Sequence, residues 1–218
     1  MRVIDLFCGS GGASMGIRQA AFSKEIVGVD IVGQPNYPFD FILGDAMDIH
    51  MSVLRSFDFI WASPPCQAFS KAARQHRDRG KEYPDYISAT RAMLKESGVP
   101  YVIENVEHAP LDNYIFLCGT MFPELRVIRH RIFECSFPFE FPFVYGLKCN
   151  HKGKATLESG GEYYTVAGHM TGSVEEWGRA MGIDWMATKE ELAQAIPPVY
   201  SRFVFNRFAK WYRLSRGR

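Results

Sequence analysis

The fold is decided by the segment Val3-Ile4-Asp5-Leu6-Phe7-Cys8-Gly9-Ser10-Gly11-Gly12. It begins as a short apolar run typical of a buried strand and ends as a glycine-rich loop. Residues 13–21 then have helical character, so the segment predicts a strand, a tight loop and a helix. Such a loop lets the backbone approach a ligand closely and directs free helical N–H groups toward it. Glycine-rich turns also serve purely structural roles, so the loop alone does not define a site.

The first two thirds of the chain continue this alternation. Further strands are expected over residues 25–30, 57–62 and 101–104, and a further helix over 86–96. Alternating strands and helices are typical of an α/β fold, here a Rossmann-like parallel sheet with helices on both faces.

The sequence pattern changes from Phe122 onward. Prolines interrupt residues 137–143, and residues 148–162 are polar and rich in glycine and lysine. Helical character returns over residues 174–181, 189–195 and 199–214. We therefore expect an α/β domain over 1–134, a small irregular insertion over 135–172, and C-terminal helices over 173–218 that complete the domain. In the last helix Tyr200, Val204, Phe208 and Trp211 share one face, which is expected to pack on the body.

Composition and cysteine spacing favour an ordinary cytoplasmic protein without a membrane partner. The 218 residues are 47% hydrophobic, and no apolar run approaches the ~20 residues that a membrane span needs. The five cysteines are odd in number and widely spaced, which favours reduced thiols. Cys149-x-His151 could form half of a zinc site with Cys118 or Cys135, but no C-x-x-C pair supports this, and no metal is expected.

The net charge is only +1, but the basic residues are clustered. One cluster lies in residues 71–81 and the other in the C-terminal residues 200–218. Each predicts a contact with a polyanion, and each is equally compatible with a solvated surface. Their members are Lys71, Arg74, Arg77, Arg79 and Lys81, and Arg202, Arg207, Lys210, Arg213, Arg216 and Arg218.

Two carboxylates follow the glycine loop at the positions where a nucleoside is usually bound. Asp30 ends the second expected strand, where an acidic side chain commonly accepts hydrogen bonds from ribose hydroxyls. Gly44-Asp45-Ala46 follows at the next turn, where a second carboxylate can accept from an adenine amino group. The three turns together favour an adenosine-containing cofactor.

Cys66 lies at the end of another expected strand, directly after Pro64-Pro65. The prolines restrict the loop, and a helix start nearby would lower the pKa of the thiol and favour the thiolate. The polar neighbours Ser63, Gln67 and Ser70 indicate an accessible mouth, whereas a buried and inert cysteine is the plainer interpretation.

Three more groups belong to the same edge. Glu104-Asn105 ends the following strand, and a partly buried carboxyl there could hold and deliver a proton; an ordinary solvated or lysine-paired carboxylate is the alternative. Arg129 and Arg131 alternate in a strand-like stretch, so both are expected to face one side and reach one anion or carbonyl, unless they simply face solvent.

The sequence resembles the cytosine-5 DNA methyltransferases. The resemblance covers residues 1–134 well and 174–205 loosely, and its combination of motifs is highly specific. The motifs, in order, are Asp5-Leu6-Phe7-Cys8-Gly9-Ser10-Gly11-Gly12, Gly44-Asp45, Pro64-Pro65-Cys66-Gln67, Glu104-Asn105-Val106, Arg129-His130-Arg131 and a divergent Ile196-Pro197-Pro198.

The resemblance implies S-adenosylmethionine as the methyl donor. Phe7 would lie against the adenine, Asp30 would bind the ribose and Asp45 the exocyclic amine. The full set of implied cofactor-binding residues is Phe7, Gly9, Gly11, Gly12, Asp30, Ile31, Asp45, Ala46 and Pro64.

The resemblance also implies the catalytic residues Cys66, Glu104, Asn105, Arg129 and Arg131. Cys66 would add to cytosine C6, Glu104 would act at N3, Asn105 would fix its surroundings, and Arg131 would hold O2. The substrate would be DNA with the target base flipped out of the helix. Residues 71–81 would form the loop that closes over DNA, and the basic C-terminus is a second candidate contact.

Three departures from the family qualify this prediction. Val127 replaces a usual glutamine, and only Arg179-Ala180-Met181-Gly182 remains of an arginine-rich motif. The insertion 135–172, identified as a reduced target-recognition region, is short, so we expect relaxed specificity or a helper chain. Alternative readings are a methyltransferase of the same fold acting on tRNA or single-stranded nucleic acid, and an inactive nucleic-acid-binding homologue.

Overall fold

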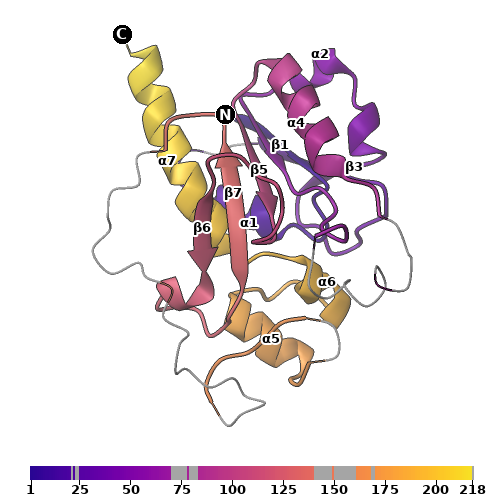
Figure 1. Ribbon diagram of the computed structural model, residues 1–218, viewed down its shortest axis with the longest axis vertical. Coiled ribbons are helices and arrows are strands. Elements are labelled where there is room, and N and C mark those ends of the chain that lie inside the picture. Colours follow the sequence, from indigo (N-terminus) through magenta and orange to yellow (C-terminus); the bar gives the residue numbers. More distant parts are fainter. Residues whose placement is uncertain are drawn as a thin grey trace.

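The structure is a computed structural model that describes residues 1–20, 22, 25–69, 78, 83–139, 149, 161–167 and 170–217. These residues form one seven-stranded sheet with helices on both faces (Figure 1). The strands are β1 (Arg2–Leu6), β2 (Glu25–Asp30), β3 (Asp40–Leu43), β4 (Phe59–Ala62), β5 (Tyr101–Asn105), β6 (Ile115–Cys118) and β7 (His130–Cys135). The α-helices are α1 (Gly12–Gln19), α2 (Met51–Leu54), α4 (Tyr86–Ser97), α5 (Val174–Met181), α6 (Lys189–Gln194) and α7 (Pro198–Arg216), and Ala46–Asp48 and Gly119–Met121 form 3-10 turns.

The strand order is β3-β2-β1-β4-β5-β7-β6. The first five strands are parallel, whereas β7 runs antiparallel to both of its neighbours. The expected Rossmann-like class is confirmed, but the sheet is mixed rather than wholly parallel. The short connections around β6 and β7 explain the reversal, because a parallel neighbour needs a crossover of a dozen or more residues.

Successive residues of the central strands supply two separate cores, since strand side chains alternate between faces. Val3 belongs to the core beneath α1 and α7, whereas its neighbour Ile4 belongs to the core beneath α2 and α4. The expected face of the last helix is confirmed, because Tyr200, Val204 and Phe208 are fully buried. No helix in the described part of the chain is both long and apolar enough to cross a membrane.

Helix α7 packs so closely on α1 that two glycines are required. A Cβ on Gly16 would lie 1.8 Å from the Pro198 carbonyl oxygen, and one on Gly12 would lie 2.6 Å from that of Ile196. The Ser201 hydroxyl also donates to the Ala13 carbonyl over 2.8 Å. The amino end of α7 is therefore locked beside the glycine loop.

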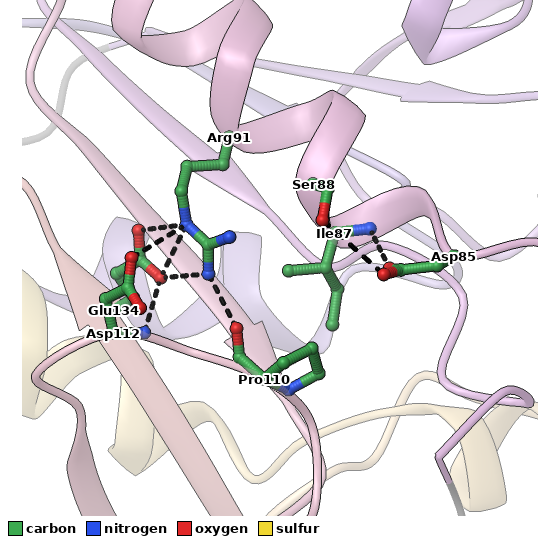
Figure 2. Close-up of polar contacts among 7 residues, drawn as sticks. All are labelled: Asp85, Ile87, Ser88, Arg91, Pro110, Asp112 and Glu134. Carbon is green, nitrogen blue, oxygen red and sulfur yellow. Dashed lines mark hydrogen bonds and ion pairs between the residues drawn. The ribbon is translucent and has the colours of Figure 1, made fainter.

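One arginine of helix α4, Arg91, links this helix to strand β7 and to the loop after β5. Figure 2 shows Arg91 reaching from α4 to Glu134 of β7, with a shortest N–O distance of 2.7 Å, and donating to the Pro110 carbonyl. Glu134 also accepts from the backbone N–H of Asp112 over 2.9 Å. These contacts tie β7 to α4 and to the loop that follows β5.

The insertion is described only in part, so its expected irregular character stays a prediction. Its returning segment passes beside the residues before β7: Tyr164 donates its backbone N–H to Arg126 and accepts from that of Ile128. Val127, between them, is fully buried and bridges to Tyr164, so valine at this position serves packing. At Arg179-Ala180-Met181-Gly182, the Ala180 carbonyl accepts from the Arg126 N–H over 3.0 Å.

Candidate active site

A cavity of about 340 Å³ lies at the carboxyl ends of β1, β4 and β5. This is the edge at which open α/β sheets bind their ligands. The cavity is lined by most of the residues expected from the sequence: Phe7, Gly9, Gly12, Asp30, Ile31, Pro64, Cys66, Glu104, Asn105 and Arg131. Four expected residues are not part of its lining: Gly11, Asp45, Ala46 and Arg129.

The glycine loop forms one wall and adopts unusual backbone conformations. Phe7 has φ 59° and Gly9 has φ 50°, both in the left-handed region. A non-glycine residue there is strained by about 1–3 kcal/mol, and such strain is concentrated at functional sites. The Gly9 N–H donates to the Asp30 carboxylate over 2.9 Å, and the Val32 N–H donates to its other oxygen over 3.0 Å. Asp30 therefore holds the loop while its half-buried carboxylate lines the cavity.

Three expected cofactor positions, Gly11, Asp45 and Ala46, support the structure around the cavity instead of lining it. Gly11 has φ 85° and caps α1, and a Cβ there would lie 3.0 Å from the side chains of Tyr37 and Pro38. Asp45 accepts from the Met47 N–H and caps the 3-10 turn, within which Ala46 is buried. Of the three, Asp45 keeps a half-exposed carboxylate.

The Cys66 loop is held by Asn105. The Asn105 amide donates to the Pro64 carbonyl over 2.9 Å, while its own oxygen accepts from the Val106 N–H. The expectation that the pKa of Cys66 is lowered is wrong, and residues 67–69, the last described ones of this segment, form a turn. Burial raises the pKa of the thiol, and the positive charge of Arg131 opposes that rise.

Glu104 and Arg131 form a buried ion pair beside the thiol. The Arg131 Nε lies 2.9 Å from Glu104 Oε1, and both side chains are largely buried. Burial raises the pKa of Glu104, while Arg131 and then Arg129 counteract this. Burial thus makes this carboxyl easier to protonate than an exposed one, which suits a group that transfers a proton.

Arg129 has a different task from Arg131. Its guanidinium donates to the Val166 carbonyl over 2.7 Å and to the Ala193 carbonyl over 2.6 Å. It therefore joins the returning insertion to α6, and its buried charge acts on Cys66 and Glu104 from behind the cavity lining. We expected both arginines to reach one anion or carbonyl, but Arg129 binds two backbone carbonyls while Arg131 pairs with Glu104.

A further wall of the cavity was predicted only at Ile196, whose motif resembles one that lies against the cofactor. It consists of Ala193, Gln194, Ala195 and Ile196, at the end of α6. The Ser10 hydroxyl donates to Glu191 over 2.9 Å, which fastens α6 to the glycine loop. The Ile196-Pro197-Pro198 motif pointed to this region, but the small residues before it carry no pattern that predicts a binding wall.

The structure describes most of the C-terminal basic cluster but almost none of the cluster in residues 71–81. Apart from Asp78, residues 71–81 lie outside the described residues. Helix α7 starts at the cavity and runs to the opposite end of the sheet (Figure 1), where Tyr212 donates to Asp58 over 3.1 Å. Arg213 lies over the Phe22 ring just before β2, so this arginine sits at the sheet end remote from the cavity, whereas Arg202, near the start of α7, pairs with Glu124.

The residues around the cavity fit a nucleoside-bearing methyl donor. The left-handed Gly9 leaves open space where a Cβ would be, and Asp30 and Asp45 offer carboxylate acceptors. A thiol, a buried carboxyl and a guanidinium line the same cavity. The chain thus has a Rossmann-like α/β fold in which a glycine loop and a cysteine line one cavity.

Comparison with known proteins gives the family. The profile of the C-5 cytosine-specific DNA methylases matches residues 1–109, half of the chain. The chain therefore belongs to this family. It is 29% identical over 119 residues to type II methyltransferase M.NlaIV of Neisseria lactamica, covering 49% of this chain and 28% of the relative. It is 32% identical over 123 residues to M.HgiGI of Herpetosiphon aurantiacus, covering 51% of this chain and 94% of the relative.

The structural comparison agrees on the fold. The solved methyltransferase EhMeth of Entamoeba histolytica superposes with a TM-score of 0.63 over 96% of this chain and 98% of its own length, at 12% identity. The matched region spans only about a quarter of M.NlaIV and of M.NgoBV of Neisseria gonorrhoeae, 28% in each case.

Proposed function

We propose that this protein transfers a methyl group from S-adenosylmethionine to C5 of cytosine in DNA, through a transient bond between Cys66 and C6. The observation that carries the proposal is the single cavity in which the glycine loop faces Cys66, Glu104 and Arg131. The family provides the reaction class, and the arrangement of these side chains provides roles for them.

The glycine loop is the proposed binding site for the adenosine part of the donor. Phe7 lines the cavity beside Asp30, whose carboxylate retains lone pairs for ribose hydroxyls after binding two backbone N–H groups. Ile31 is 68% exposed next to it and can cover the adenine. Asp45 lies at the margin and is the proposed acceptor for the exocyclic amine. When bound, S-adenosylmethionine supplies an electrophilic methyl group on a sulfonium sulfur.

Cys66 is the proposed nucleophile. Its thiol gives its proton to solvent, and the resulting thiolate forms a bond to cytosine C6, which makes C5 electron-rich enough to take up the methyl group while the electrons of the broken S–CH3 bond stay on the donor sulfur. The C5 proton then passes to solvent, its bonding electrons restore the C5–C6 double bond, and the S–C6 bond breaks to release the thiolate. Asn105 positions the loop for this attack through the Pro64 carbonyl.

Glu104 and Arg131 are proposed to stabilise the charge that develops in the base. As the thiolate adds, Glu104 delivers a proton to N3, and it recovers that proton when Cys66 leaves. Arg131 can donate to O2 while its ion pair with Glu104 keeps both groups in place. Arg129 contributes positive charge from behind and holds the surrounding elements.

DNA is the proposed macromolecular partner, with residues 71–81 as the loop that closes over it. The remote position of the last arginines of α7 makes the C-terminus a poorer candidate for contacting the same DNA segment. The shortness of residues 135–172 supports a short or relaxed target sequence, or recognition shared with a second chain.

The decisive test is covalent trapping with 5-fluorocytosine. The protein is incubated with S-adenosylmethionine and oligonucleotides that carry 5-fluorocytosine, as duplex DNA, single-stranded DNA and tRNA. Fluorine blocks the final elimination, so the protein should remain bound to the DNA duplex as an adduct that survives denaturing electrophoresis. Cys66→Ser should abolish the adduct, whereas Cys135→Ser, which alters a cysteine outside the cavity, should leave it intact.

Two results would overturn the proposal. An adduct that persists in Cys66→Ser removes this residue as the nucleophile. An adduct formed with tRNA or single-stranded DNA but not with the duplex transfers the reaction to the other substrate. Sequencing of methylated random DNA tests specificity, since a preference over about six base pairs would contradict a relaxed recognition region.

A further inference from the structure

A second cluster of metal-ligating side chains lies outside the catalytic cavity. Cys118 ends β6, His130 begins β7, and Cys149 comes from the insertion. One ligand atom from each of these three residues lies within 4.8 Å of the other two. None of the three lines the cavity that holds Cys66. Residues separated by up to 31 positions are thus gathered at one point of the sheet edge.

The geometry of the histidine suits a metal ligand. Its Nδ1 is hydrogen-bonded to the Glu107 carboxylate, which leaves Nε2 facing the cysteines. Cys149 Sγ lies 3.6 Å from that Nε2. A carboxylate on the second nitrogen of a ligating histidine is the usual arrangement at protein zinc sites, because it fixes the ring and raises its basicity.

The spacing also matches tetrahedral coordination. With Zn–S about 2.3 Å and Zn–N about 2.0–2.1 Å, two ligand atoms at a tetrahedral angle are about 3.6 Å apart. This equals the observed distance between Cys149 Sγ and His130 Nε2. Cys118 is buried, and its Sγ lies 3.3 Å from the Thr120 hydroxyl, so this thiol is held in place.

We propose that Cys118, His130 and Cys149 bind one zinc ion, with Glu107 orienting the histidine and a water molecule completing the tetrahedron. This revises the expectation from sequence that the cysteines bind no metal. The sequence pattern offered His151 beside Cys149, with either Cys118 or Cys135 as their partner. In the structure Cys135 lies at the far end of β7 from His130, and His151 lies outside the described residues.

The zinc ion would join the insertion to the strand that carries Arg131. His130 and Arg131 are consecutive in β7, and Cys149 is on the segment proposed to recognise the target. A metal bond between them fixes where the insertion leaves the sheet relative to the catalytic arginine. A metal bond of this kind contributes folding free energy, which matters most in a short segment.

The test measures the metal directly and does not depend on methyl transfer. The full chain is expressed with added zinc, purified under reducing conditions without chelators, and analysed by inductively coupled plasma mass spectrometry. We expect about one zinc ion per chain, and a lower melting temperature once a chelator has removed it. Cys118→Ser and Cys149→Ser should each lose the zinc, while the matched control Cys135→Ser should retain it.

A cobalt titration keeps the proposal testable if a cysteine variant fails to fold. Added to the zinc-free wild-type protein, Co²⁺ should give the visible bands of a tetrahedral site and the near-ultraviolet absorption of thiolate ligands. Less than about a tenth of an equivalent of zinc together with no such spectrum would overturn the proposal. A Cys118–Cys149 disulfide in the reduced preparation, detected by thiol counting and peptide mass mapping, would also overturn it.

Discussion

Two consecutive residues of β7 face two different clusters. Arg131 pairs with Glu104 in the cavity of the candidate active site, whereas His130 pairs with Glu107 beside Cys118 and Cys149. Strand side chains alternate between faces, so one strand can serve both clusters without mixing them. Each cluster contains a carboxylate and at least one cysteine, yet the partners of these groups differ.

Because their partners differ, the pKa values of the two thiols shift in opposite directions. Burial acts to raise the pKa of both Cys66 and Cys118. Around Cys66 the charge of Arg131 offsets only part of this rise. Around Cys118, hydrogen bonds with His130 and Thr120 bring the pKa down to about 7. A cysteine alone therefore says little about reactivity, and the groups that face it decide its chemistry.

The largest expected effect comes from exchanging the carboxyl in each cluster. Glu104→Gln retains the size of the side chain but cannot deliver a proton, so methyl transfer should fall by about 10²–10⁴-fold while S-adenosylmethionine binding is retained. The matched change Glu107→Gln should leave methyl transfer nearly unaltered and weaken zinc binding by about 10–100-fold. Radiolabelled methyl incorporation, calorimetry and metal competition measure the three quantities. Equal losses of methyl transfer in both variants would remove the proposed separation of the clusters.

The next effect tests the charge of Arg131. Arg131→Met should reduce the rate by about 10²–10³-fold, since a donor to the developing charge is lost. It should also move the whole pH–rate profile to higher pH, because Arg131 lowers the pKa of both Cys66 and Glu104. Arg131→Lys keeps the charge but not the planar fork, so it should slow the reaction without moving the profile. An unshifted profile in Arg131→Met would contradict the electrostatic role.

The sequence predicted most of the central sheet because its strands are continuous apolar runs ending in turns. Strands β1, β2, β4 and β5 follow this pattern, and so do the capped helix α4 and the amphipathic α7. The edge strand β3 was missed because it buries little: Ile42 is 41% exposed and Leu43 65%. The direction of β7 depends on the length of its connections and on no local pattern.

The sequence predicted those site residues that belong to motifs at the ends of strands. It did not predict contacts between residues that are far apart in the sequence. Cys66, Glu104 and Arg131 come from different strands yet line one cavity, since the sheet edge brings strand ends together. Nothing local indicates that Arg129 binds the carbonyls of Val166 and Ala193. The gathering of Cys118 with His130 was likewise hidden, because it depends on the pairing of β6 with β7.

The smallest expected effect concerns a buried carboxyl that is held by a hydroxyl rather than a guanidinium. Burial raises the pKa of Asp5 to about 7, and the Ser14 hydroxyl, 2.5 Å away, opposes the rise. The folded pKa lies above the unfolded value of about 3.9, so the folded state binds more protons between these values and becomes less stable as pH rises through them. Between pH 6 and pH 8 the ionisation of Asp5 should lower the free energy of unfolding by about 1 kcal/mol.

Asp5→Asn fixes the side chain in a neutral form and should remove that dependence, as measured by urea unfolding at the two pH values. The control is Asp58→Asn. The pKa of Asp58 is lowered. Burial acts to raise it, but hydrogen bonds, among them one from the backbone N–H of Arg2 to the Asp58 carboxylate, lower it by more. Asp58 is therefore ionised at both pH values and its replacement should leave the dependence unchanged. If Asp5→Asn retained the full loss of stability between pH 6 and pH 8, burial would not be what raises the pKa of Asp5. The comparison with Glu104, where Arg131 is taken to oppose the effect of burial on the pKa, would then lose its basis.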